Sequence, residues 1–85
     1  MKIKYGYILR KVADSYVALS VGAENEGRVV RMNSTGAFIW EIISKGAELE
    51  DTVSALKEKY GIDDQTATKA ATDFIEMLRK EDLLA

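Results

Sequence analysis

The chain has 85 residues, of which 47% are hydrophobic and 31% are charged, a composition that excludes a disordered or fibrous protein. A chain of this length holds one hydrophobic core, so we expect a single domain over residues 1–85. With 12 basic and 14 acidic residues, the net charge is −2. This sign disfavours a protein that binds nucleic acid by neutralising phosphates.

The side chains used most often in catalysis are missing. The sequence has no cysteine and no histidine, which removes thiol nucleophiles, thiolate metal sites and the most common general base and metal ligand. No glycine spacing is typical of a phosphate-binding loop. Acidic clusters occur near residues 48–51, 63–64 and 81–82, at expected helix ends, where capping and solvated charge account for them. We therefore expect no enzymatic activity, no metal and no cofactor.

The expected location is the cytoplasm. The absence of cysteine suits a reducing compartment. The first residues lack the apolar run and the small-residue cleavage site of a signal peptide. No apolar stretch is long enough to span a bilayer, so we expect no membrane partner.

The first third of the chain predicts three strands. Residues 5–12 and 16–21 are rich in β-branched and aromatic residues, and they flank Asp14 and Ser15, where we expect a tight turn. A polar, glycine-bounded stretch at residues 22–27 leads into a short strand-like run at residues 28–32. The first two strands should form a hairpin.

The rest of the chain predicts three helices. Asn33 and the two residues after it can cap a helix whose apolar residues cover most of its circumference and which ends near Gly46. This helix should be the centre of the core, with Trp40 as its main residue. Apolar residues at helical spacing then predict a helix ending at Gly61 and another beginning after Asp63 or Asp64. The apolar stripe of the last helix is Ala67, Ala70, Phe74 and Leu78.

Three strands followed by three helices predict an α+β domain, with an antiparallel sheet packed on a helical bundle. The order is compatible with a winged-helix-like unit whose wing lies at the amino end.

The segment Met-Asn-Ser-Thr-Gly-Ala-Phe-Ile-Trp-Glu at residues 32–41 resembles the signature of the PqqD family. In that family an asparagine, a triplet like Thr-Gly-Ala and an Ile-Trp pair open the first helix. Further matches extend to the terminal leucines, so the resemblance covers nearly the whole chain. The chain departs from the family at Glu48, at Ala70 with Ala71, and at Asp82, although aspartate tolerates a left-handed cap better than most residues.

The resemblance implies a fold of three strands and three helices and a role as a non-catalytic recognition element for ribosomally synthesised peptides. The leader of the precursor peptide would add as a strand to the third strand, and the third helix would form the other wall of the groove. The second implied partner is a modifying enzyme, often a radical S-adenosylmethionine enzyme. The product would be a peptide natural product or a PQQ-like cofactor.

The candidate site therefore combines an unpaired strand edge, which offers backbone donors and acceptors to an extended peptide, with one face of the third helix. The strand candidates are Arg28, Val29, Val30, Arg31 and Met32. The helix candidates lie beside the apolar stripe or at its margin: Thr68, Lys69, Ala71, Thr72, Ile75 and Arg79. Phe74 and Leu78 should back the groove rather than line it. The cationic members predict a locally positive groove that suits an acidic leader.

Two alternatives remain open at this level. The strand edge could be an ordinary solvated edge protected by arginines. The domain could also be a winged-helix DNA-binding regulator, although its net charge and the acidic residues of its third helix argue against this. The sequence allows a monomer or a weak dimer through the free strand edge.

Overall fold

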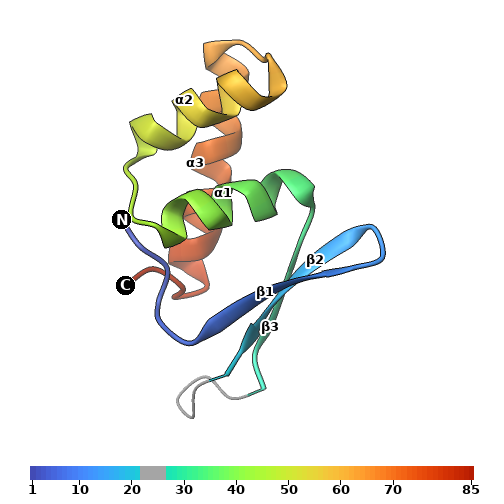
Figure 1. The fold of residues 1–85 in the computed structure, drawn as a ribbon. Coiled ribbons are helices and arrows are strands. Elements are labelled where there is room, and N and C mark those ends of the chain that lie inside the picture. The colour runs from blue at the N-terminus through green and yellow to red at the C-terminus, as the bar shows by residue number, and fades with distance from the viewer. Residues whose placement is uncertain (22–26) are drawn as a thin grey trace.

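The computed structural model describes residues 1–21 and 27–85. Its elements are β1 (Tyr7–Val12), β2 (Ser15–Ser20), β3 (Val29–Met32), α1 (Ser34–Ser44), α2 (Leu49–Tyr60) and α3 (Asp64–Lys80), as Figure 1 shows. The predicted α+β order is confirmed. The polar stretch predicted at residues 22–27 lies outside the described residues except for its last glycine. None of the helices in the described ranges is long and apolar enough to cross a membrane.

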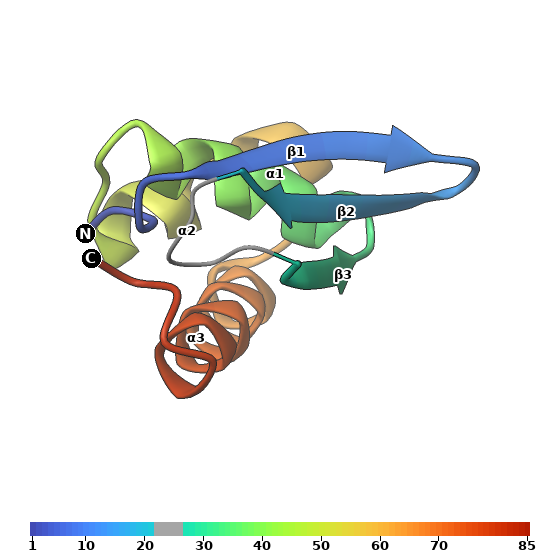
Figure 2. The same cartoon turned by 90° about the horizontal axis from the view of Figure 1, so that it is seen from below.

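The sheet is antiparallel, with strand order β1-β2-β3. The predicted turn was placed one residue too late: Val12 pairs with Ser15, so Ala13 and Asp14 form the turn, and Ala13 adopts a φ of 55°. Both β1 and β3 are edge strands. Figure 2 shows that α3 lies on the β3 side of the sheet.

Helix α1 is the centre of the core, as predicted. It lies between the inner face of the sheet and the other two helices (Figure 1). Ile39, Trp40 and Ile43 are each at most 3% exposed. The Trp40 ring meets Tyr7 of β1 edge to face, with ring centroids 5.8 Å apart. Because Trp40 is buried in this packing, its predicted role in the core is confirmed.

The helix ends follow the predicted caps. Asn33 Oδ1 accepts a hydrogen bond of 2.8 Å from the Gly36 amide at the start of α1. Asp63 Oδ1 accepts one of 2.8 Å from the Thr66 amide at the start of α3. Hydrogen bonds from Thr66 lower the pKa of Asp63. Gly61 ends α2 in the left-handed conformation, with a φ of 64°.

The two ends of the chain pair with each other. Ile3 and Leu84 form a β-bridge, and the Lys4 amide donates a hydrogen bond of 2.8 Å to the Leu83 carbonyl. Lys4 Nζ also contacts Asp82 Oδ2 at 2.8 Å, and this hydrogen bond lowers the pKa of Asp82. Asp82 has a φ of 58°, the left-handed conformation expected of it. These contacts hold the segment after α3 against the segment before β1.

The buried hydroxyl of Tyr7 has no hydrogen-bond partner in the part of the chain that the structure describes. We predict that Tyr7→Phe raises the free energy of unfolding by about 1 kcal/mol, because an unsatisfied buried donor is removed while the ring packing remains. Urea denaturation followed by Trp40 fluorescence measures this change. Tyr5→Phe is the control, since Tyr5 is 99% exposed and its hydroxyl is hydrated. A less stable Tyr7→Phe protein would contradict the prediction.

Candidate functional site

A groove of about 400 Å³ lies between the end of β3, the start of α1 and one face of α3. Its lining is mainly apolar, which is typical of sites that bind ligand side chains. The lining residues are Arg31, Met32, Asn33, Thr35, Gly36, Ile39, Ala70, Asp73, Phe74 and Met77.

The backbone of β3 offers hydrogen-bonding groups on its open edge. The Ser20 amide donates to the Arg28 carbonyl at 3.1 Å, and the Arg28 amide donates to Ser20 Oγ at 3.1 Å, so these two residues form a hydrogen-bonded pair between the two chain segments. In an antiparallel ladder such pairs alternate with pairs that do not exchange bonds. Val30 therefore directs its backbone groups towards β2, whereas Val29 and Arg31 direct theirs away from the sheet. An extended chain placed along β3 would pair with Val29 and Arg31.

Gly36 allows α1 to approach α3 closely at the groove. A Cβ added to Gly36 would lie 2.9 Å from Phe74 Cε1 and 3.1 Å from Met32 Cβ. The signature segment thus contributes Asn33, Thr35 and Gly36 directly to the groove. The sequence signal that could have indicated this is a glycine in the first turn of an otherwise bulky, apolar helix.

The predicted strand residues take different positions. Arg31 and Met32 line the groove, and Val29 is 54% exposed beside it. The Val30 side chain packs against the core. Arg28 forms an ion pair with Glu81, with Nη2 3.2 Å from Oε1, and also donates to the Glu81 backbone carbonyl. Arg28 therefore ties the start of β3 to the end of α3.

None of the six residues predicted as the wall on α3 lines this groove. Ala71 and Ile75 are 0% and 5% exposed and belong to the core. Thr68, Thr72 and Arg79 lie on the side of the helix that faces the start of α2. The physical reason is that α3 carries a broad apolar arc, and α2 covers the part of it that was expected to face the peptide.

The groove face of α3 is instead formed by Ala70, Asp73, Phe74 and Met77. Phe74 therefore lines the groove, contrary to the expectation that it backs it, whereas Leu78 is fully buried, which agrees with a backing role.

The expected positive character of the groove is reduced to one arginine. Lys69 Nζ lies 2.9 Å from Asp73 Oδ2, and this hydrogen bond raises the pKa of Lys69. The pair stands at the groove rim and carries no net charge. Arg79 lies elsewhere, so among the described residues the remaining cationic residue at the groove is Arg31, whose strand position turns its side chain to the face of the sheet opposite Met32.

The described residues contain no group of three or more acidic side chains placed to hold a metal ion. The chemistry available in the groove is apolar contact and backbone hydrogen bonding. In this geometry an extended chain can add as a strand to β3 and place its side chains in the groove.

These features define a class of protein: a winged-helix-like α+β domain with an apolar groove beside a free strand edge. The chain belongs to the PqqD family: the family model described as coenzyme PQQ synthesis protein D (PqqD) matches residues 15–84. This match confirms the resemblance found in the signature segment.

Two solved structures are similar to this chain. One is TbiB1 in complex with the TbiA(beta) leader peptide, with 26% sequence identity, a TM-score of 0.77 and coverage of 99% of this chain and 94% of that one. The other is lasso peptide synthetase B1 complexed with the leader peptide, with 17% identity, a TM-score of 0.76 and coverage of 99% and 95%. A comparison with curated proteins found no match. None of the similarities found supports the alternative of a DNA-binding regulator.

We predict that Gly36→Ala displaces the Phe74 ring and lowers the free energy of unfolding by about 1 kcal/mol, because the new methyl group must enter occupied space while the helix gains propensity. Ring-proton chemical shifts of Phe74 and a urea titration measure the two effects. Gly61→Ala is the control: its Cβ meets nothing within 4 Å, so its cost comes from the positive φ alone. Unchanged Phe74 signals in Gly36→Ala would contradict this account.

Proposed function

We propose that this chain binds the leader segment of a ribosomally synthesised precursor peptide and presents the peptide to a modifying enzyme. The leader would add as a fourth strand on the open edge of β3 and place apolar side chains into the groove beside α3. The observation that carries the proposal is the position of an apolar groove directly beside a strand edge whose backbone groups at Val29 and Arg31 are directed outward.

The comparisons support this proposal. TbiB1, which is similar over nearly the full length of both chains, was solved with a leader peptide. The family description names coenzyme PQQ synthesis. Leader-peptide binding and coenzyme PQQ synthesis are thus both linked to proteins that resemble this chain. This suits a scaffold that recognises peptides and leaves the chemistry to a partner.

The modifying enzyme belongs to the same proposal. In our proposal catalysis takes place in that partner, and the domain raises the effective concentration of the modifiable segment at its active site. A radical S-adenosylmethionine enzyme stays the predicted partner. The cytoplasmic location and the monomeric or weakly dimeric state also stay predictions.

The first test is a titration of the isotope-labelled protein with the leader encoded beside its gene, with duplex DNA as a second ligand. We expect saturable shifts of the amides of residues 28–33 and of Ala70, Phe74 and Met77. Arg31→Pro should weaken the leader affinity by about tenfold or more, because proline removes an outward amide and its ring obstructs the edge.

Lys11→Pro is the matched control for the edge. The Val21 amide donates to the Gly6 carbonyl, so the same alternation directs the Lys11 amide outward on the opposite edge, that of β1. This variant should keep the leader affinity within about twofold. Equal losses in the two variants, or shifts with DNA and none with the leader, would contradict strand addition to β3.

A second test distinguishes the two faces of α3. Ala70→Lys places a long side chain in the groove and should weaken leader binding by about tenfold or more, because it displaces the apolar contacts of the leader. Thr72→Lys adds the same charge on the face towards α2 and should leave the affinity within about twofold. Isothermal titration calorimetry measures both. A larger loss of leader affinity in Thr72→Lys than in Ala70→Lys would support the groove wall that the sequence predicted.

A further inference from the structure

The outer face of the sheet, which points away from the helices, carries an open apolar row. Cross-strand partners in an antiparallel sheet share a face. Ile8 pairs with Leu19, and Leu19 pairs with Val29, so these three side chains form one row across all three strands. Ile8 is 42% and Val29 is 54% exposed. The core-facing side chains, such as Ala18, alternate with this row, which confirms that it lies on the outer face.

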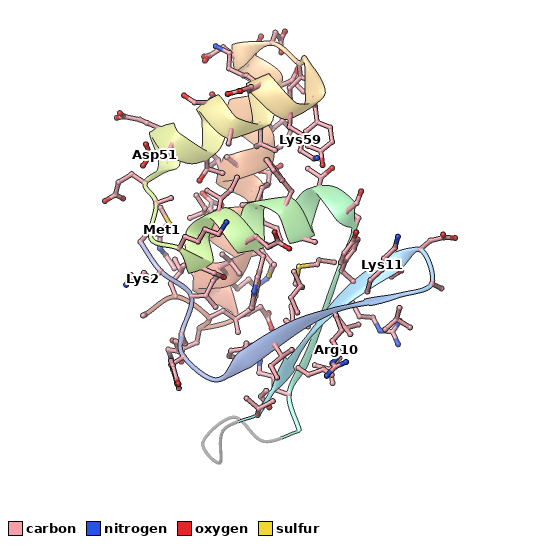
Figure 3. All side chains as sticks on the ribbon, viewed as in Figure 1. Met1, Lys2, Arg10, Lys11, Asp51 and Lys59 are labelled. Atoms are coloured by element: carbon pink, nitrogen blue, oxygen red, sulfur yellow. The ribbon has the colours of Figure 1, made fainter. Side chains whose placement is uncertain are left out.

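A second row on the same face consists of Arg10, Val17 and Arg31. Val17 is 9% exposed and stands on the middle strand between the two arginines. The outer strands stand about 10 Å apart, so the two arginines flank a narrow apolar strip. Figure 3 shows Arg10 on the side of the hairpin away from the helices and Lys11 on the side towards them.

This outer face differs from the solvated face of an ordinary antiparallel sheet, which alternates polar residues outward. No strand residue that the pairing places on it is acidic. Within residues 1–21 and 27–85, neither Arg10 nor Arg31 forms an ion pair or a side-chain hydrogen bond. An exposed apolar patch with uncompensated cations at its sides is the composition of an interaction surface.

The charge of the chain is distributed unevenly. Residues 1–33 carry six basic and three acidic side chains, whereas residues 34–85 carry six basic and eleven acidic ones. The sheet end of the molecule is therefore the basic end. A surface that complements the outer face must offer an apolar strip flanked by carboxylates.

We propose that the outer face of the sheet docks the modifying enzyme, through an apolar strip on that enzyme bordered by acidic side chains. The assignment of this partner rests on the proposed function. Arg31 belongs both to this face and to the groove, so an enzyme bound to the face lies beside a leader bound along β3. The two partners occupy adjoining but different surfaces, which lets the domain hold both at once.

The test compares Arg10→Glu with Lys11→Glu, measured against the purified modifying enzyme encoded beside the gene. The two substitutions make the same change of charge at neighbouring exposed positions of β1, on opposite faces. Arg10→Glu should weaken the enzyme affinity by about tenfold or more, because it sets a carboxylate against carboxylates, and Lys11→Glu should stay within about twofold. Biolayer interferometry at two salt concentrations measures both, and the wild-type affinity should fall as salt rises.

Ile8→Ser gives a second measurement that does not depend on charge. It should weaken enzyme binding by about tenfold, since it removes the centre of an apolar contact. Circular dichroism melting confirms that each variant is folded. Equal effects of Arg10→Glu and Lys11→Glu, or no enzyme binding by the wild-type chain, would overturn the proposal. Self-association of the chain that Arg10→Glu abolishes would assign the face to a second copy and would overturn it as well.

Leader titrations of the same proteins separate this inference from the proposed function. Arg10→Glu should keep the leader affinity within about twofold while it loses the enzyme. A wild-type chain that docks the enzyme through Arg10 but binds no leader would refute the proposed function and leave the docking face standing. If the wild-type chain binds the leader and the Arg10→Glu variant still binds the enzyme with full affinity, the docking face is refuted and the proposed function stands.

Discussion

The burial of α1 around most of its circumference is the constraint on which the rest of the structure depends. A helix that is apolar around most of its circumference must be covered by the sheet on one side and by other helices on the rest. Only Asn33 separates β3 from α1, so the position of α1 also determines where β3 ends. The Trp40 ring against Tyr7 completes the contact with β1. The placement of the binding edge thus follows from the same packing that forms the core.

The groove exists because α3 meets the sheet only at one end. Arg28 and Glu81 connect the start of β3 with the end of α3, and the paired chain termini hold the segment that follows α3. Towards the end of β3, the groove lies between β3 and α3, and Gly36 lets α1 pack closely against Phe74 beside it. The edge of β1 has outward backbone groups too, but α3 lies on the β3 side of the sheet and not beside β1 (Figure 2). The difference between the two edges therefore lies in the neighbouring helix.

The molecule separates two kinds of recognition. The groove combines apolar lining with backbone groups, which suits a peptide bound by main-chain hydrogen bonds and a few side chains. The outer face is apolar and basic, which suits the surface of a folded partner. An exposed strand edge is an aggregation hazard, and β3 limits it by being only four residues long and by carrying Arg31. The same arginine borders both surfaces.

The sequence by itself determined the order of elements, the caps and the central role of α1, because these depend on local hydrogen bonds and on periodicity. The signature around Asn33 and Gly36 also indicated the family and the use of β3. The sequence could not determine which face of α3 meets the groove. Seven apolar residues spread over two adjoining stripes of that helix, and both stripes have the same period. Only the tertiary structure decided that Ala71 and Ile75 are buried in the core and that Ala70 and Phe74 lie at the groove, because the choice depends on where distant elements pack.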